Sequence, residues 1–425
     1  MSARSWRLLL RDKQVLSWCL YDWANSAFAT TVMAGFFPVF FKQYWSAAGS
    51  VSESTAKLGL ANTVASFCLG ISAPFLGAIA DRSRGRKKLL FAFTFLGALS
   101  TAALFLVAQG NWLLAALLYV LGSMGFSGAQ SFYDALLVAV AKPREMDLVS
   151  GLGYGLGYLG GGVLFAINVF MTLRPEIFGL ASPAEAVQIS FLSVGVWWLI
   201  FTIPLLTFVN EPELPHPKES LIEIFRGAWS QLISTFHHLR SIRPAYLFLI
   251  ANFFYIDGVN TMIKMAVDYG MSLGFPSNSL IVALLLVQFI GFPAAIGFSA
   301  IASRISTKRA LYLAIGIYAL VTAFAATISE VWHFYALAGS IGLVQGGIQA
   351  LSRSAFGKMI PADKSGEFFG FFNMLGRFSS VLGPTLIAVT SLISTSPRLS
   401  LVSLLLLFAT GGYLLSRVPF PEEHK

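Results

Sequence analysis

Charged and amide side chains recur at helical spacing inside a long apolar stretch of this sequence. Five residues fall at steps of +3, +4, +7 and +11, on one stripe of a helix: Asp257, Asn260, Thr261, Lys264 and Asp268. Ionised groups are costly in an apolar environment and normally face a partner or a water-filled passage. The stripe therefore predicts a place where a polar solute or a proton is handled, although Asp257 and Lys264 could also pair as a structural device.

Three other apolar stretches carry similar stripes, and a fourth adds two polar residues. The stripes consist of Asp22, Asn25 and Ser26; of Ser127, Gln130, Ser131 and Asp134; and of Gln345, Gln349 and Arg353, with Asn373 and Arg377 as the addition. Spacings of three and four place each set on one helix face. We expect the stripes at 22–26, 127–134, 257–268 and 345–353 to line one polar cavity that serves as a solute and ion pathway.

Several of these residues have alternative interpretations. Asp22 could cap the start of a helix. Asp134 and Arg353 could form a charge pair across the cavity or bind the two ends of a zwitterion, and Arg377 could contact an anionic group or tie its helix to a neighbour. Because burial in a low dielectric favours the protonated carboxyl group, Asp257, Asp134 and Asp22, in that order, are candidate proton carriers.

The elements that carry these stripes are expected to be membrane-spanning helices. Only 12% of the 425 residues are charged and 56% are hydrophobic, whereas soluble domains are about one quarter charged. Apolar runs of about 20 residues are long enough to cross a bilayer, and a chain in lipid must satisfy its own backbone hydrogen bonds as helices. Twelve spans are predicted, at 17–41, 55–80, 89–109, 112–141, 149–172, 188–209, 245–269, 278–302, 309–329, 332–358, 367–394 and 398–417.

The distribution of basic residues predicts the orientation of these spans. With both termini in the cytoplasm, 22 of the 29 Lys and Arg residues face the cytoplasm, four face the opposite side and three lie within spans. This asymmetry follows the positive-inside rule and accounts for the net charge of +9 without nucleic acid as a partner. The first apolar run is too long for a signal-peptide core, so it is expected to remain as a span. We expect a multi-pass protein of a bacterial inner membrane.

Three pairs of short segments indicate an internal repeat. The pairs are 22–26 with 257–261, 81–87 with 303–309, and 122–125 with 339–342, at separations of 235, 222 and 217 residues. Each pair joins one predicted span or loop to the sixth one after it. We therefore predict two duplicated six-helix bundles, 1–209 and 244–425, with a binding site between them. The linker 210–243 contains an amphipathic stretch from 219 that could lie in the membrane interface or pack on the protein.

The loop after the second predicted span has features of a latch. Gly77 permits close helix approach, Asp81 can accept hydrogen bonds at a helix start, and Arg82 and Arg86 can bind groups on the facing bundle. Such a loop would hold the cytoplasmic side closed. Positive-inside charge alone would explain the arginines, but not Gly77 or Asp81.

Other chemistries find little support in the sequence. The glycine-rich run 151–162 lies in an apolar span and is expected to thin a helix for close packing rather than to bind phosphate. No nucleotide-binding Gly-Lys-Ser/Thr motif, metal-ligand cluster or nucleophile–base set stands out. Cys19 and Cys68 both fall in apolar segments, so neither a disulfide nor a metal site is expected. We do not expect an enzyme or an ATP-driven pump.

Several segments resemble the family of fungal vacuolar amino-acid effluxers and their bacterial relatives, within the major facilitator superfamily. They are 21–27, 153–162, 257–258, 345–347, 352–354, 368–370 and 383–384, and the loop 77–88 resembles the superfamily's loop between spans 2 and 3. The resemblance implies two six-helix bundles rocking about a central site, no tightly bound cofactor, and gate-loop roles for Asp81 and Arg86. Ser303 occupies the acidic position of the second copy, so a weaker latch is implied there.

The expected function is secondary transport of a small polar solute, such as an amino acid or a peptide-like metabolite, by alternating access, with protons as a candidate coupling ion. A second hypothesis is export of a larger amphiphile such as a siderophore or drug. A third is a non-transporting receptor or scaffold, which has no use for costly buried charges. The expected partners are the solute and the lipid bilayer, with the chain acting as a monomer.

The predicted pathway can be tested by substitution. Asp257→Asn and Arg353→Ala should each abolish solute flux in proteoliposomes while the protein still folds, because each removes a buried charge assigned to the pathway. Unchanged flux in both variants would remove these residues from the pathway.

Overall fold

The computed structural model describes residues 6–46, 85–211, 233–272, 276–379, 382–393 and 397–420, with positions 53, 57 and 60 in addition. In these ranges the chain is almost entirely helical and contains no strand. The predicted span 55–80 lies almost wholly outside the described residues, as does most of the predicted amphipathic linker segment, of which 233–241 is helical.

The first set of helices runs from α1 to α8. Its members are α1 (Trp6–Leu9), α2 (Lys13–Ala27), a π-helical segment (Phe28–Phe36), α3 (Phe37–Phe40), a second π-helical segment (Phe41–Trp45), α5 (Arg86–Ala103), a short 3₁₀ helix (Leu104–Leu106), α6 (Trp112–Val140), α7 (Met146–Leu173), a 3₁₀ turn (Pro175–Phe178) and α8 (Pro183–Phe208). We call these the first set.

The second set runs from α10 to α17. Its members are α10 (Arg243–Ser272), α11 (Ser277–Ile305), α12 (Thr307–Ala325), α13 (Val331–Met359), a 3₁₀ turn (Ala362–Lys364), α14 (Ser365–Phe378), α15 (Leu382–Ile393), α16 (Pro397–Val402) and α17 (Leu405–Ser416). We call these the second set.

Nine helical stretches in the described ranges are long and apolar enough to cross a membrane. Their ends differ from the predicted spans by up to six residues, since sequence patterns locate helix ends less accurately than they identify the helices. The predicted spans 367–394 and 398–417 each appear as two shorter helices, α14 with α15 and α16 with α17. In the described ranges the structure therefore confirms an all-helical fold with helices long enough to span a membrane, without establishing the predicted number of twelve spans.

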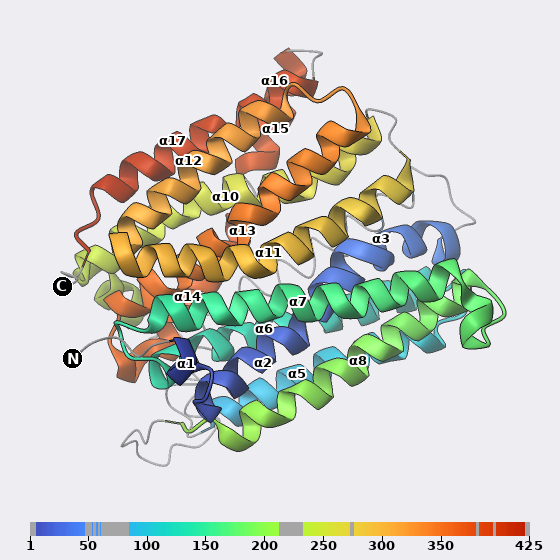
Figure 1. Ribbon diagram of the computed structural model, residues 1–425, viewed down its shortest axis with the longest axis horizontal. Coiled ribbons are helices and arrows are strands. Elements are labelled where there is room, and N and C mark those ends of the chain that lie inside the picture. The colour runs from blue at the N-terminus through green and yellow to red at the C-terminus, as the bar shows by residue number, and fades with distance from the viewer. Residues whose placement is uncertain are drawn as a thin grey trace.

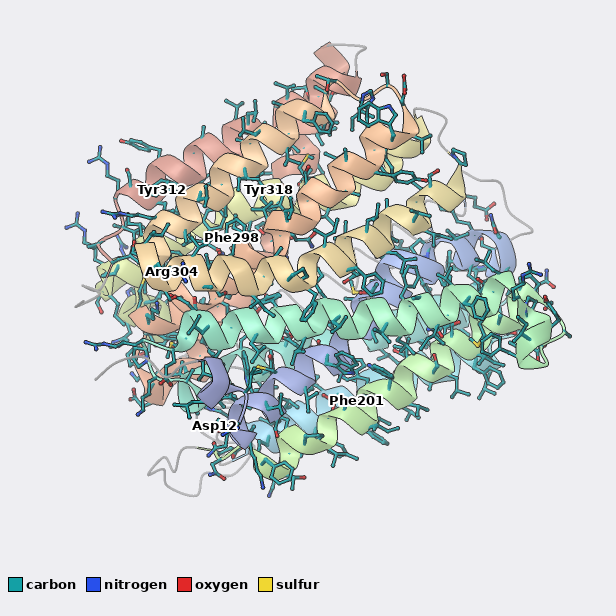
Figure 2. All side chains as sticks on the ribbon, in the orientation of Figure 1. Asp12, Phe201, Phe298, Arg304, Tyr312 and Tyr318 are labelled. Atoms are coloured by element: carbon teal, nitrogen blue, oxygen red, sulfur yellow. The ribbon has the colours of Figure 1, made fainter. Side chains whose placement is uncertain are left out.

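Local side chains define where several helices begin. Asp12, labelled in Figure 2, accepts a hydrogen bond from the backbone N–H of Gln14 at 3.0 Å and so caps α2. Ser182 caps α8 in the same way, through the N–H of Glu185. Ser306 has a φ of +116° at the sharp turn between α11 and α12 and accepts from the N–H of Arg309. These caps satisfy N–H groups that no helical turn can pair.

The two sets lie against each other along α7 and α11. Figure 1 shows both chain termini at one end of the molecule, which we call the termini end, and shows α7 and α11 side by side through the middle. Contacts between the sets come chiefly from α7 with α11 and α13, and from α6 with α14. From the termini end toward the opposite end, the two sets fan apart in this view.

Glycines on α7 make this close approach possible. A Cβ atom at Gly151 would lie 1.9 Å from Ser299 Oγ, one at Gly155 would lie 3.0 Å from Ile296 Cγ1, and one at Gly162 would lie 2.9 Å from the Cβ of a glutamine on α11. Contacts this short leave no room for a side chain. The structure thus confirms that the glycine-rich run serves close helix packing.

Matching lysine contacts occur in the two sets. Lys87, at the start of α5, donates from Nζ to two carbonyl oxygens at the end of α8, at 2.9 and 2.7 Å. Lys308, at the start of α12, donates from Nζ to two carbonyl oxygens at the end of α17 and just beyond it, at 3.2 and 2.7 Å. Each lysine satisfies free carbonyls at a helix end and meets the negative end of its dipole.

The packing of α2 also has a counterpart in the second set. A Cβ atom at Gly157 on α7 would meet Ser26 Oγ at 2.6 Å, and one at Gly383 on α15 would meet Thr261 Oγ1 at 2.0 Å. Ser26 and Thr261 are the matched residues of the first repeated segment. The repeated sequence segments therefore make equivalent contacts in the two sets.

The α7–α11 contact predicts the effect of a larger side chain at its centre. Gly151→Val should separate these helices, because overpacking a close contact costs about 1–3 kcal/mol. The measurement is oxidative cross-linking of Gly155→Cys with Ile296→Cys, in a protein whose native cysteines are replaced by serine. We expect the yield to fall in Gly151→Val.

Gly297→Val is the matched control for this experiment. It lies on α11 with no atom within 4 Å of the position a Cβ would take, so the cross-link should form as in the parent protein. An unchanged yield in Gly151→Val would contradict the packing described here.

Candidate functional site

Arg353 on α13 is the centre of a buried charge cluster. Its Nη1 lies 3.1 Å from Asp134 Oδ1 on α6, and both Nη1 and Nη2 lie 3.3 Å from Asp22 Oδ2 on α2. Arg353 also donates from Nε to Ser150 Oγ at 2.9 Å and from Nη2 to the Ser150 carbonyl at 3.0 Å, both on α7. An arginine of the second set is thus bound by three helices of the first set, with only 1% of its surface exposed.

Aromatic rings enclose the guanidinium group. Its carbon lies 4.2 Å from the ring centre of Tyr154, 4.8 Å from that of Trp18 and 5.3 Å from that of Tyr133. The Tyr133 hydroxyl donates to Asp22 Oδ2 at 2.7 Å, and the Trp18 indole N–H donates to the Tyr133 carbonyl at 3.0 Å. Desolvated cation–π contacts of this kind favour the charged arginine and fix its direction.

Asp134 receives two further hydrogen bonds from amide side chains. Gln130 Nε2 donates to Oδ1 at 3.0 Å, and Asn373 Nδ2 on α14 donates to Oδ2 at 3.1 Å. Asn25 Nδ2 on α2 donates to Gln130 Oε1 at 2.9 Å. These hydrogen bonds run from Asn25 through Gln130 to Asp134 and connect the interior of the first set to the cluster.

The cluster lies nearer the termini end than the middle of the helices. Arg353 is six residues before the end of α13, and Asp134 is six residues before the end of α6. At 1.5 Å per residue, both lie about 9 Å from helix ends, whereas half of a helix of 29 residues is about 22 Å. The charges of the cluster therefore meet on the side that carries the termini.

A second group of polar contacts lies still closer to the termini end. Asp147, in the first turn of α7, is 2.7 Å from Lys358 Nζ and accepts from Thr307 Oγ1 at 2.8 Å and from Ser354 Oγ at 2.6 Å. Lys358 also donates to Thr307 Oγ1 at 2.8 Å. One carboxylate of the first set is thus held by α12 and α13 of the second set, a contact that the sequence did not indicate.

Arg86 is the one predicted gate-loop residue that the structure describes. It is buried at the start of α5, and its Nη1 donates to Ser365 Oγ at the start of α14, at 2.9 Å. This contact joins the two sets at the termini end. Gly77, Asp81 and Arg82 lie outside the described residues.

Asp257 does not lie in the Arg353 cluster. Its Oδ1 accepts from the N–H of Gly383 at 3.0 Å and from Thr261 Oγ1 at 3.2 Å, so it faces α15 within the second set. Asn260 is partly buried, while the side chains of Lys264 and Asp268 are not described. The four stripes expected around one cavity are therefore not gathered together in the described residues.

The remaining predicted residues have mixed outcomes. Asp22 lies inside α2, whose cap is Asp12, so the capping alternative for Asp22 is wrong. Gln349 is partly buried one turn before Arg353 on α13, and the side chain of Arg377 is not described. Asn373 donates to Asp134 of the first set, as well as to the Phe369 carbonyl on its own helix α14.

The sequence did not single out the aromatic and serine members of the cluster. Trp18 lies one helical turn before Asp22, Tyr133 adjoins Asp134, and Tyr154 lies four residues after Ser150. The polar stripes were defined by charged and amide residues. An aromatic residue in an apolar span cannot be distinguished by its type from one that faces lipid. The sequence signal that could have identified these residues is an aromatic residue within one helical turn of a charged residue in an apolar span.

Comparison with known proteins places the chain among transporters. A family model described as "Vacuole effluxer Atg22 like" matches residues 11–145 and 138–424. The uncharacterized MFS-type transporter YxiO of Bacillus subtilis (strain 168) is 40% identical over 409 residues, covering 96% of this chain and 95% of that protein. Autophagy-related protein 22 of Yarrowia lipolytica is 25% identical and covers 74% of this chain and 67% of its own length.

Solved structures share the fold at low sequence identity. The human organic anion transporter MFSD10 aligns with a TM-score of 0.70 at 15% identity, covering 95% of this chain and 99% of that chain. The proton:xylose symporter XylE aligns at 0.67 and 14%, covering 97% and 96%. FucP in the outward conformation aligns at 0.66 and 14%, covering 97% and 100%. At these identities the likeness concerns the fold alone.

The cluster predicts a specific pattern of stability. Arg353→Ala should lower stability by about 3–5 kcal/mol, because it leaves the buried acidic partners, Asp134 above all, without their counter-ion. Adding Asp134→Asn should restore part of this loss by removing an uncompensated charge. Thermal unfolding of the purified protein in detergent measures both effects, and a double variant less stable than Arg353→Ala would contradict the charge arrangement.

Proposed function

The chain belongs to the Atg22-like family of vacuole effluxers within the major facilitator superfamily of transporters, and from this premise we propose a specific activity for it. It is a secondary transporter that moves a small polar solute, an amino acid or a peptide-like metabolite, across the bacterial inner membrane. It works by alternating access and is driven by protons. A single chain contains both helix sets and acts as a monomer.

The single observation that carries this proposal is the binding of Arg353 by the opposite helix set. Ion pairs within a bilayer are costly and persist where they serve a pathway or a moving interface. Asp22 and Asp134 belong to the first set and Arg353 to the second, so the cluster breaks when the sets separate and re-forms when they close. A protein that only needed rigidity would gain more from apolar packing at this contact.

Contacts at the termini end support a state that is closed on that side. Asp147 with Lys358, and Arg86 with Ser365, join the same two sets beyond the Arg353 cluster. The excess of basic residues assigns this side to the cytoplasm. These contacts support an outward-facing state of the proposed transporter, with a cytoplasmic gate of two layers of polar contacts.

Amide groups above the cluster suit a small polar solute. Each amide lies about one helical turn from the cluster member on its own helix, on the side away from the termini end. The amides are Asn25 on α2, Gln130 on α6 and Gln349 on α13. Amides offer both donors and acceptors without a net charge. They can therefore bind a neutral or zwitterionic molecule approaching from the open side.

Reconstituted protein tests the proposal directly. Proteoliposomes are given an inward proton gradient and a labelled mixture of L-amino acids and short peptides, chosen after a thermal-shift screen with the same compounds. We expect gradient-dependent flux by the parent protein and its loss in Arg353→Ala, because the buried carboxylates then lack the group that controls closure.

Arg304→Ala is the matched control, since Arg304 is an exposed arginine at the end of α11, labelled at the termini end in Figure 2. Its flux should equal that of the parent protein. Absence of flux for all these solutes in the parent protein, or full flux in Arg353→Ala, would overturn the proposed function.

A further inference from the structure

The Arg353 cluster contains one more acidic group than basic groups. Asp22, Asp134 and Arg353 have side-chain exposures of 6%, 4% and 1%. With both carboxyl groups ionised, the cluster has a net charge of −1 in a low dielectric, which costs several kcal/mol. One bound proton makes the cluster neutral, so the question is which carboxyl group binds it.

Asp134 has the surroundings of an ionised carboxylate. Both of its oxygens accept hydrogen bonds: Oδ1 from Arg353 and Gln130, and Oδ2 from Asn373. Donors thus occupy both oxygens of Asp134, which favours the negative form and leaves neither oxygen free of a donor for a proton. The arginine contact to Asp134 is also the shorter one, 3.1 Å against 3.3 Å for Asp22.

Asp22 has the surroundings of a neutral acid. Its contacts with the Tyr133 hydroxyl and with both Nη atoms of Arg353 all converge on Oδ2. Among the described residues, no donor reaches Oδ1. A carboxylic acid has one carbonyl oxygen that accepts and one hydroxyl oxygen that carries the proton, and the two oxygens of Asp22 are divided in this way.

The other titratable groups near Asp22 do not provide an alternative site. They are Cys19 and Tyr21 on α2, Tyr133 on α6, and Tyr154 and Tyr158 on α7, besides Asp134 on α6 and Arg353 on α13. The packed helix α8 has only Glu185, at its opposite end. Buried thiols and phenols stay neutral near neutral pH, so Asp22, Asp134 and Arg353 are the charges that decide.

We propose that Asp22 is the proton-binding residue of this transporter, through Oδ1, and that Asp134 remains ionised as the fixed counter-ion of Arg353. A proton taken from water on the open side changes the cluster from −1 to neutral. Neutral Asp22 attracts Arg353 less, so one of the two ion pairs that join the sets is weakened while the other remains. When the sets separate, the proton leaves Oδ1 for cytoplasmic water. The use of the proton rests on the proposed transport function, but its binding to Asp22 does not.

Infrared difference spectroscopy can identify the protonated residue without a solute. The purified full-length protein is titrated between about pH 5 and pH 9, and the carbonyl stretching band of a protonated carboxylic acid is followed. We expect one titrating band in the parent protein and its loss in Asp22→Asn. Asp134→Asn is not informative in the same way, because it makes the remaining Asp22–Arg353 pair neutral and so also removes the need for a proton.

Two matched variants decide between the carboxyl groups. Of the two carboxyl groups, Tyr133→Phe removes a hydrogen bond to Asp22 alone, and Asn373→Leu removes one to Asp134 alone, together with a bond to the Phe369 carbonyl. A carbonyl that loses a hydrogen bond absorbs at higher frequency, so the band should shift upward in Tyr133→Phe and stay in place in Asn373→Leu.

Several results would overturn this assignment. They are a shift in Asn373→Leu, no shift in Tyr133→Phe, a band that persists in Asp22→Asn, or no titrating band in the parent protein. If Asp22→Asn fails to fold, the pair Tyr133→Phe and Asn373→Leu still decides. Failure of the amino-acid flux assay would leave the infrared result unaffected, so the two proposals fail separately.

Discussion

Burying a guanidinium group inside a membrane protein imposes its requirements on much of the surrounding structure. Arg353 needs negative charge, hydrogen-bond acceptors and close contact on all sides, because water is excluded from it. Asp22 and Asp134 supply the charge, Ser150 supplies two acceptors, and three aromatic rings lie against the guanidinium group. Since all these groups come from the first helix set, the arginine of the second set makes the contact between the sets depend on electrostatics as much as on shape.

The helices around the cluster are arranged in accordance with that requirement. Ser150 can reach Arg353 because α7 begins only a few residues earlier and packs against α13. The glycines that follow on α7 bring its backbone against α11. The same helix therefore positions a polar acceptor near the termini end and a side-chain-free surface farther along. Asp147 in its first turn adds a third contact with the second set.

Sequence patterns predicted the helices well because membrane spans carry a strong signal. Long apolar runs and basic loops set the ends of α6, α7 and α13 within a few residues. The pairing of Asp134 with Arg353 was among the alternatives, because both residues are buried charges on helical stripes. The depth of the cluster and the separate position of Asp257 were not predictable in this way. Helical periodicity gives the face of a helix, but not the rotation of that face toward one neighbour or another.

Residues of the second polar layer were missed for a different reason. Asp147 and Lys358 occur next to short basic loops, where charged residues are expected in water. Asp147 is buried to 4% exposure and contacts side chains of α12 and α13. When burial arises from contacts between segments that are distant in sequence, the residues next to the buried group do not indicate it.

The glycine face of α7 also limits how this contact can change during evolution. Glycine is already the smallest residue, so every replacement at 151, 155 or 162 adds volume to a surface with contacts of 1.9 to 3.0 Å for an added carbon. Adjustment of fit must therefore come from the opposing helix, where Ser299 and Ile296 can become smaller. Among natural variants, the two sides of this contact should differ in their tolerance of substitution. The glycine positions on α7 should be nearly invariant, whereas the facing positions on α11 should vary.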